Sequence, residues 1–283
     1  MPELPEVETV VRGLHRTILG RTITKIRVQA PPSSIVVSRS FNGAGFEACL
    51  RRRRIESVTR RGKNILIGLS GDVTLWVHLK MTGRFQFVAK KEPTDRHHLV
   101  VFDLAAGNAS GGRQLRFRDT RRFGRLRVFR DDELWRQKGL AELGPEPLQI
   151  SPKEFVTLFK SSRRMIKPAL LDQTFLAGLG NIYADEALYL SRIHPRRLTS
   201  TLSAGKLIEL HGHIQTVLNK AIRLMGTTVF TFSGVNRRSG SFQKHLNVYG
   251  KEGEPCIRCG AAIVRERIGS RSAHFCPRCQ RQR

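Results

Sequence analysis

The residues best suited to chemistry stand at the start of the chain, which begins Met-Pro-Glu-Leu-Pro-Glu. Removal of Met1, which a small second residue permits, leaves Pro2 as a secondary amine, and the reference pKa of an α-amino group, about 8, keeps much of it unprotonated at neutral pH. Such an amine can attack a sugar C1′ and form an iminium ion, a covalent electron sink. Glu3 and Glu6 lie within one helical turn, where a carboxylate can act as a general acid. The alternative is an ordinary helix start that tolerates proline and favours acidic residues.

Four cysteines near the C-terminus form a second chemical group. They are Cys256, Cys259, Cys276 and Cys279. Two Cys-x2-Cys pairs separated by 16 residues fit a tetrahedral zinc ribbon. Two disulfides are the alternative, which an intracellular redox context disfavours. Because four thiolates leave no open position for a substrate, we expect one structural Zn²⁺. We expect no redox or nucleotide cofactor. The ribbon would present Arg271 at the tip of a short hairpin.

The chain is strongly basic, with 50 Lys and Arg against 23 Asp and Glu and a net charge of +27. Both halves share the excess, so it is not a basic tail. Self-repulsion of this size destabilises a compact state unless a polyanion offsets it. Nucleic acid is therefore the expected partner, and a membrane surface or a ribosome is the competing one. The chain has no apolar run of 18 residues and no signal-peptide composition at its start. We expect a monomeric, cytoplasmic, nucleoid-associated protein.

The elements that must position these residues change character along the chain. Residues 3–19 carry apolar side chains at helical spacing. Residues 22–129 contain short strand-like runs at 22–28, 55–59, 64–69, 73–79, 85–88, 99–104, 114–117 and 126–129. Residues 143–148 form a Pro- and Gly-containing linker. Helical spacing returns at 152–159, 168–176, 182–193 and 203–225, and 226–250 has no clear period. The pattern predicts an α+β chain with an N-terminal β-sandwich, a leading helix and a helical C-terminal part.

Three further places could bind a nucleic acid. Residues 177–182 join two predicted helices, and a helix starting at Asn181 would offer backbone N–H groups to a phosphate; the alternative is a turn with Asn181 as N-cap. Lys63 precedes an apolar strand, where lysines are usually solvated. Met81 and Phe123 stand in loops near arginines, which suits insertion into a base stack. Their alternative is a place in the core.

Together these residues resemble the formamidopyrimidine-DNA glycosylase family. The resemblance covers nearly the whole chain and rests on the Pro2–Glu8 start, Lys63, the 121–124 loop, the 178–186 turn and the zinc ribbon. It implies removal of oxidised purines, 8-oxoguanine and formamidopyrimidines, from duplex DNA, with AP lyase activity by β,δ-elimination. It also implies a catalytic β-sandwich at 1–145, a helix-two-turn-helix domain at 150–225, a flexible lesion-covering loop at 226–250 and a zinc ribbon at 251–283.

The resemblance also implies roles for the residues that do the chemistry. Pro2 would form the Schiff base with C1′, and Glu3 would donate a proton at the sugar. Glu6 would be a structural or assisting carboxylate beside the bound DNA. Lys63 would donate the proton for β-elimination and bind phosphate. Arg271 would serve in δ-elimination and hold the phosphates of the lesion.

Other matched positions would bind DNA. Met81, Arg121 and Phe123 would fill the gap left by the flipped base, with Arg121 facing the orphaned cytosine. Asn181 would bind the kinked backbone. His97 and Arg163 match further DNA contacts.

The sequence departs from the family pattern in the segment 231–245, where Arg237 and Arg238 add charge and leave the preferred lesion open. An endonuclease VIII-like enzyme for oxidised pyrimidines is the near alternative, but such enzymes usually begin Pro-Glu-Gly-Pro-Glu and lack the Arg-Arg-Phe-Gly loop. A non-catalytic damaged-DNA-binding protein and an RNA-binding zinc ribbon are the alternatives from other classes. A chain that keeps Met1 would bind DNA without cutting it.

Overall fold

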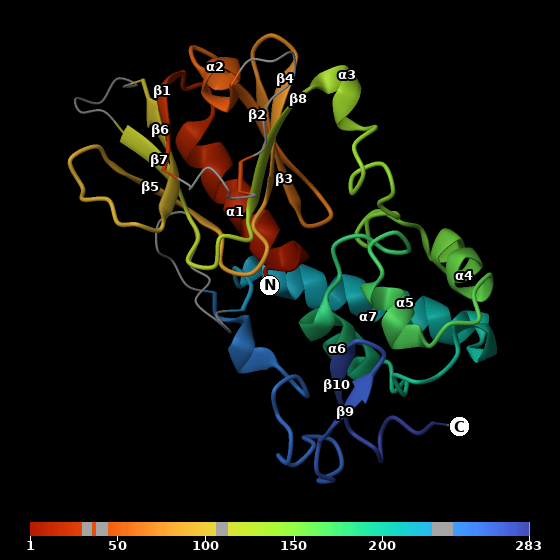
Figure 1. Ribbon diagram of the computed structural model, residues 1–283. Coiled ribbons are helices and arrows are strands. Elements are labelled where there is room, and N and C mark those ends of the chain that lie inside the picture. The colour runs from red at the N-terminus through yellow and green to blue at the C-terminus, as the bar shows by residue number, and fades with distance from the viewer. Residues whose placement is uncertain (30–35, 38–44, 106–112, 228–239, 283) are drawn as a thin grey trace. The chain divides into compact units, whose positions relative to one another are not determined.

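The computed structural model describes residues 1–29, 36–37, 45–105, 113–227 and 240–282. Contacts between Cα atoms divide the chain into two compact units (Figure 1). The first contains Met1–Ala141 and Met225–Ser241, and the second contains Glu142–Leu224 and Phe242–Arg283. Among the described residues, no helix is both long and apolar enough to cross a bilayer.

The first unit opens with helix α1 (Leu4–Ile18). Its apolar residues recur every three or four positions, so one face is buried, including Val7, Val10 and Leu14. Glu3 is the N-cap residue, and Gly20, at φ 76°, follows the helix end. The buried face packs against strands β2 and β3.

Two antiparallel sheets follow α1. One has the order β1-β6-β7-β5 and the other the order β2-β3-β4-β8. The first sheet contains β1 (Ile23–Val28), β5 (Arg84–Ala89), β6 (His98–Leu104) and β7 (Arg113–Arg118). The second contains β2 (Ile55–Arg61), β3 (Asn64–Leu69), β4 (Val73–His78) and β8 (Arg125–Arg130). Two short helices, α2 (Phe46–Leu50) and α3 (Asp131–Leu134), were not expected from the sequence.

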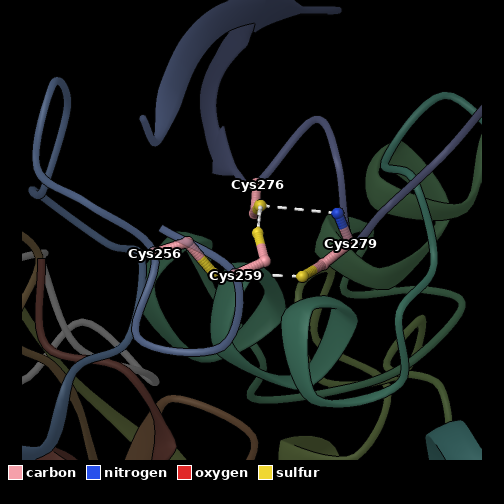
Figure 2. Close-up of side chains that lie close together, drawn as sticks. All are labelled: Cys256, Cys259, Cys276 and Cys279. Atoms are coloured by element: carbon pink, nitrogen blue, oxygen red, sulfur yellow. Dashed lines mark hydrogen bonds between the residues drawn. The ribbon is translucent and has the colours of Figure 1, made fainter. Parts of the chain in front are cut away.

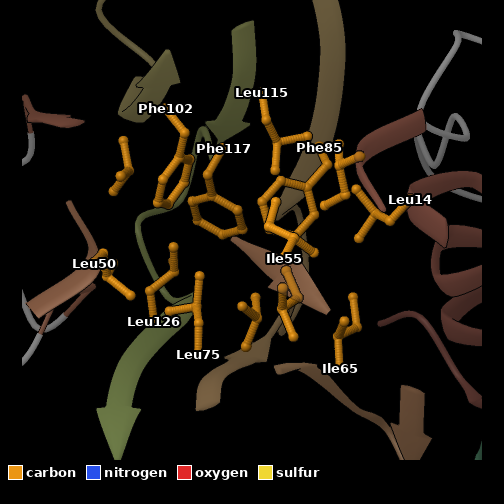
Figure 3. Close-up of a cluster of buried hydrophobic side chains, with 14 of the residues drawn as sticks. Leu14, Leu50, Ile55, Ile65, Leu75, Phe85, Phe102, Leu115, Phe117 and Leu126 are labelled. Atoms are coloured by element: carbon orange, nitrogen blue, oxygen red, sulfur yellow. The ribbon is translucent and has the colours of Figure 1, made fainter. Parts of the chain in front are cut away.

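The core of this unit lies between the two sheets and includes the inner face of α1 (Figure 3). Phe85 and Phe117 of the first sheet meet edge to face, with ring centroids 5.4 Å apart. Leu75 and Leu126 come from the second sheet, and Leu14 comes from α1. The expected sandwich with a leading helix is thus observed.

The second unit is helical and ends in a hairpin. Its elements are α4 (Pro152–Lys160), α5 (Ile166–Leu171), α6 (Asn181–Leu190), η2 (Thr199–Thr201), α7 (Ala204–Arg223), η3 (Phe242–His245), β9 (Val264–Ile268) and β10 (Arg271–Phe275). Serines start two of the helices, because Ser151 Oγ accepts from Glu154 N and Ser203 Oγ accepts from Lys206 N. The α+β fold class predicted from the sequence is confirmed.

Two local expectations differ from the structure. The helix expected at 168–176 begins two residues earlier and ends at Leu171, because the Asp172 carboxylate accepts from the backbone and hydroxyl of Thr174 and forms a turn instead. Of the expected loop 226–250, residues 228–239, with Arg237 and Arg238, lie outside the described residues. The described remainder includes the 3-10 turn η3.

Candidate functional site

One carboxylate, that of Glu6, fixes the backbone at the start of the chain. Pro2, Glu3 and Glu6 are all buried. Glu6 Oε2 accepts from Glu3 N at 2.9 Å, and Glu6 Oε1 accepts from Thr227 N at 2.8 Å. Gly226 has a φ of 78°, and a Cβ there would lie 2.5 Å from Glu6 Oε1. Glu6 therefore joins the backbone next to Pro2 to residues just before the segment 228–239.

Lys63 lies at the tip of the β2–β3 hairpin and not at a solvated strand end, since only 6 % of it is exposed. Gly62 has a φ of 55°, which fits a two-residue type II′ loop. Arg60 ties this hairpin to α1: its Nε lies 3.1 Å from Glu8 Oε2, and its Nη1 donates to Gly62 O at 2.9 Å. The Lys63 hairpin is thereby tied to helix α1, for which Glu3 is the N-cap residue.

Several positively charged side chains lie close to His78, the last residue of β4. Burial, followed by the charges of Lys80, Lys63 and Arg125, lowers the pKa of His78 to about 3, so its imidazole is neutral. His78 Nδ1 accepts from Lys80 N at 3.0 Å. Burial and the neighbouring Arg125 and Arg127 also lower the pKa of Lys80. A polyanion would relieve this repulsion. Sequence reasoning missed His78, although its place at the end of a buried strand was a usable signal.

The side chains of Met81 and Phe123, in two loops of the sandwich, are exposed. Met81 is 41 % exposed and Phe123 is 45 % exposed, so the alternative that they fill the core is wrong. The guanidinium of Arg121 lies over the Phe123 ring, with Cζ 4.9 Å from its centroid. His97 is half-buried, and its backbone N–H donates to Asp95 Oδ1. Within the first unit, the exposed Met81 and Phe123 side chains and the basic residues beside them thus belong to neighbouring loops of the sandwich.

In the second unit, Asn181 is the first residue of α6, and Gly180 is the N-cap residue. The alternative that Asn181 caps the helix is therefore wrong. Its Oδ1 is buried and has no hydrogen-bond partner within the described part of the chain. Gln173 braces the preceding turn, because its Oε1 accepts from Gly178 N at 2.9 Å. Arg163 is exposed in the connection between α4 and α5.

The four cysteines converge in the second unit (Figure 2), with all four sulfur atoms within 4.8 Å of one another. Cys256 Sγ lies 3.9 Å from Cys279 Sγ, and Cys259 Sγ lies 3.5 Å from Cys276 Sγ. Zn–S bonds of about 2.3 Å in a tetrahedron require S–S separations of about 3.8 Å, so this donor set fits one zinc ion. Tyr189 packs on the cluster, with its Oη 3.3 Å from Cys256 Sγ.

The hairpin beside the cluster places Arg271 at the first position of β10, where it is exposed. A buried ion pair between Lys167 and Asp185 holds this hairpin. Lys167, with 0 % of its side chain exposed, lies 2.5 Å from Asp185 Oδ1 and donates to Ser272 O. Asp185 Oδ2 also accepts from His274 N at 2.9 Å. These charges immobilise the strand that begins at Arg271.

Glu186, next to Asp185, holds the segment that leads to the hairpin. Its carboxylate accepts from the backbone N–H groups of Asn247, Val248 and Tyr249 at 2.8–2.9 Å. Sequence reasoning missed Lys167, Asp185 and Glu186. The available signal was two adjacent acidic residues inside an otherwise apolar helix.

Known proteins match the chain along its length. The formamidopyrimidine-DNA glycosylase N-terminal domain matches residues 1–126, the H2TH domain of the same family matches 143–233, and a zinc finger found in FPG and IleRS matches 253–282. A formamidopyrimidine-DNA glycosylase of Pelotomaculum thermopropionicum is 46% identical over 285 residues, which covers 99% of both chains. The chain belongs to the formamidopyrimidine-DNA glycosylase family.

Other members of the family agree with this assignment. The formamidopyrimidine-DNA glycosylase of Heliobacterium modesticaldum is 44% identical, over 99% of this chain and 100% of its own. A Lactococcus lactis FPG variant in complex with Fapy-dG-containing DNA has a TM-score of 0.87 and 36% identity, over 99% of this chain and 100% of its own. A complex of Lactococcus lactis Fpg with abasic-site DNA has the same TM-score and identity, over 99% of both chains.

Membership in this family makes the chain a base-excision-repair DNA glycosylase with AP lyase activity, which acts on DNA. The zinc finger match and the four converging cysteines identify the metal as one structural zinc ion. The family, the enzyme class and the zinc ribbon predicted from the sequence are confirmed.

Proposed function

We propose that this glycosylase removes 8-oxoguanine and formamidopyrimidines from duplex DNA and cuts the strand by β,δ-elimination through a Schiff base at Pro2. The observation that carries the proposal is the Glu6 carboxylate, which holds the backbone beside Pro2. The buried Lys63 hairpin, tied to the same helix through Arg60 and Glu8, supports it further.

Chemistry at the sugar needs a nucleophile and a proton donor. Once Met1 is removed, the Pro2 amine attacks C1′, the C1′–base bond breaks, and the base leaves with a proton. Glu3 supplies a proton at the sugar, which assists ring opening to the iminium ion. Glu6 acts through the backbone, because each of its oxygens accepts from a main-chain N–H.

Strand scission follows from the covalent step. The iminium ion acidifies the C2′ protons, so loss of one of them expels the 3′ phosphate. Lys63 donates the proton for this β-elimination and binds phosphate. Arg271 serves in the second, δ-elimination, and holds the lesion phosphates. When bound, the zinc ion supplies the cross-link that keeps the Arg271 hairpin rigid.

Excision requires the base to leave the stack, which costs a few kcal/mol. Met81 and Phe123 fill the gap and offset part of this cost, and Arg121 faces the orphaned cytosine. The exposure of Met81 and Phe123 and the cation–π contact of Arg121 support these roles. Asn181, His97 and Arg163 bind the DNA backbone around the lesion.

The organisation that goes with this function has four parts: a catalytic domain at 1–145, a helix-two-turn-helix domain at 150–225, a lesion-covering loop at 226–250 and a zinc ribbon at 251–283. The matches at 1–126, 143–233 and 253–282 support the catalytic domain, the helix-two-turn-helix domain and the zinc ribbon. The net charge of +27 supports association with the nucleoid, and repulsion between equally charged copies supports a monomer.

A panel of lesions tests this proposal. Protein without Met1 is given duplexes with 8-oxoguanine, formamidopyrimidine or an oxidised pyrimidine opposite each base, together with a preformed abasic site. We expect oxidised purines opposite cytosine to be cut fastest. Glu3→Gln should lose base excision and retain cleavage at the abasic site. Faster cutting of oxidised pyrimidines would favour the endonuclease VIII-like alternative, and binding without cutting would favour the non-catalytic one.

A further inference from the structure

The two loops that carry Met81, Arg121 and Phe123 share one buried carboxylate, that of Asp119. Its side chain is 0 % exposed although it stands in a run rich in arginine. Asp119 Oδ1 accepts from the Thr82 hydroxyl, which belongs to the first loop and is 37 residues away in sequence. This buried carboxylate of Asp119 has no role in the chemistry proposed above.

The same carboxylate also holds the second loop at both ends. Asp119 Oδ1 accepts from Arg121 N at 3.1 Å, and Asp119 Oδ2 accepts from Gly124 N at 2.7 Å. The Arg121 N–H also points at Thr82 Oγ1, 3.2 Å away. Phe123 thus lies inside a turn that is closed by one side chain. Arg122, at φ 58°, has the left-handed backbone that such a closed turn imposes on a residue that does not favour it.

Packing beneath the carboxylate brings the two loops together. A Cβ at Gly83 would lie 2.9 Å from Phe117 Cζ, and a Cβ at Gly124 would lie 2.5 Å from the same atom. Both loops therefore rest on one aromatic edge. The backbone of Asp119 reaches a third segment, because its N–H donates to His97 O at 2.9 Å.

We propose that Asp119 is a positioning residue that locks the Met81 loop and the Arg121–Phe123 loop into one rigid wedge. The wedge then enters the duplex as a unit, and Arg121 meets the orphaned base in a fixed orientation. Discrimination of the opposite base depends on this lock. The inference rests on the proposed roles of Met81, Arg121 and Phe123 in filling the gap.

Asp119→Asn tests the lock because an amide cannot accept from every donor that the carboxylate serves. One of the donors would face an NH2 group, and one loop would be released. We expect excision of 8-oxoguanine opposite cytosine to fall by about 10- to 100-fold, as for a misplaced binding group, and the preference for cytosine to shrink. Cleavage of single-stranded DNA with a preformed abasic site needs no wedge and should stay at the wild-type rate.

Two variants of Thr82 and one matched control keep the test independent of folding. Thr82→Val removes the donor to Asp119 and should reproduce the loss, and Thr82→Ser keeps the hydroxyl and should restore the wild-type preference. Thr74 and Asp131 form a matched Thr–Asp pair elsewhere in the unit, with Thr74 Oγ1 2.7 Å from Asp131 Oδ1. Asp131→Asn should leave the preference for cytosine unchanged.

The fluorescence of a 2-aminopurine placed beside the lesion should increase less on binding of Asp119→Asn than on binding of the wild type.

Three results would overturn the lock. The first is an unchanged cytosine preference in Asp119→Asn and Thr82→Val. The second is an equal loss on single-stranded abasic DNA, which would make Asp119 part of the general active-site scaffold. The third is a loss of preference in Asp131→Asn. Failure of the proposed function would look different, since the wild-type protein itself would then fail to cut lesion or abasic DNA.

Discussion

At the scale of single residues, Glu6 joins two segments of the first unit that are far apart in sequence. Its carboxylate is buried and accepts one backbone N–H from the start of the chain and one from Thr227. A carboxylate can accept at both oxygens, whereas a carboxamide offers one acceptor and one donor group. The charge of Glu6 therefore matters for the backbone geometry around Pro2 as well as for any effect on the substrate.

Glu6→Gln should destabilise the first unit by about 1–3 kcal/mol, because one buried backbone N–H would lose its acceptor. Urea unfolding followed by tryptophan fluorescence would measure the change. Glu47→Gln is the matched control, since Glu47 Oε1 also accepts a backbone N–H, from Val28, but in an exposed position. Equal effects of the two variants would contradict the role assigned to Glu6.

Because of His78, we expect the stability of the first unit to fall as the pH is lowered. Its pKa is lowered to about 3 in the folded protein and has a reference value of 6.5. Between these values the unfolded chain binds the extra proton, so the contribution of His78 to stability is complete above pH 6.5 and falls as the pH drops. His78→Asn keeps an acceptor for Lys80 N and removes the titration.

We therefore expect the free energy of unfolding to decline less steeply between pH 6.5 and 5 in His78→Asn than in the wild type. Urea titrations at several pH values measure both slopes, and every other ionisable group contributes equally to the two proteins. Parallel slopes would show that the imidazole titrates normally in the folded state.

At the scale of elements, the strands and the cysteine ribbon were the most predictable parts. Short strand-like runs bounded by turn residues predicted all of the sandwich strands to within about two residues of their ends. The pairing of the strands into two sheets was not predictable from these local patterns. α5 was misplaced since Asp172 forms a turn through its side chain, a competition that spacing alone does not reveal.

The sequence predicted which residues form the candidate site, but not which residues position them. Pro2, Lys63 and Arg271 were found because of their positions next to recognisable motifs. Lys63 is buried between two strands that contact α1, and the buried Asp119 accepts a hydrogen bond from Thr82, which is far away in sequence. Such long-range contacts leave no local pattern, so the positioning residues emerge only from the fold.

The zinc ribbon is the element whose stability depends on a metal. Cys276→Ser should remove the bound zinc and unfold the β9–β10 hairpin, because a structural site supplies folding energy directly. Zinc analysis and an electrophoretic DNA-binding assay measure the two losses. Cys49→Ser, at a buried cysteine outside the cluster, should keep its zinc. Full DNA affinity in zinc-free protein would contradict the proposed role of the hairpin.

At the scale of the whole molecule, the charge of +27 makes binding to DNA an exchange of counterions. Affinity should therefore fall steeply and log-linearly with salt. Lys80, which is crowded by Arg125 and Arg127, should neutralise one phosphate. We expect Lys80→Gln to reduce the slope by about 1.

Arg196 provides the control for this measurement. Arg196 is paired with Glu266 at 3.0 Å, so its charge is already neutralised within the protein. Fluorescence anisotropy with labelled duplex over a range of salt concentrations should give Arg196→Gln the wild-type slope. An unchanged slope in Lys80→Gln would mean that this lysine does not face the DNA backbone.

The identity of the nucleophile is the claim on which the whole mechanism depends. Borohydride reduces the iminium ion to a stable link between enzyme and DNA, and peptide mapping by mass spectrometry then locates the attachment. For protein without Met1, we expect the DNA on the nitrogen of Pro2, and for protein that keeps Met1 we expect no adduct. An adduct on an internal residue such as Lys63, or no adduct from a preparation that cuts DNA, would contradict the account.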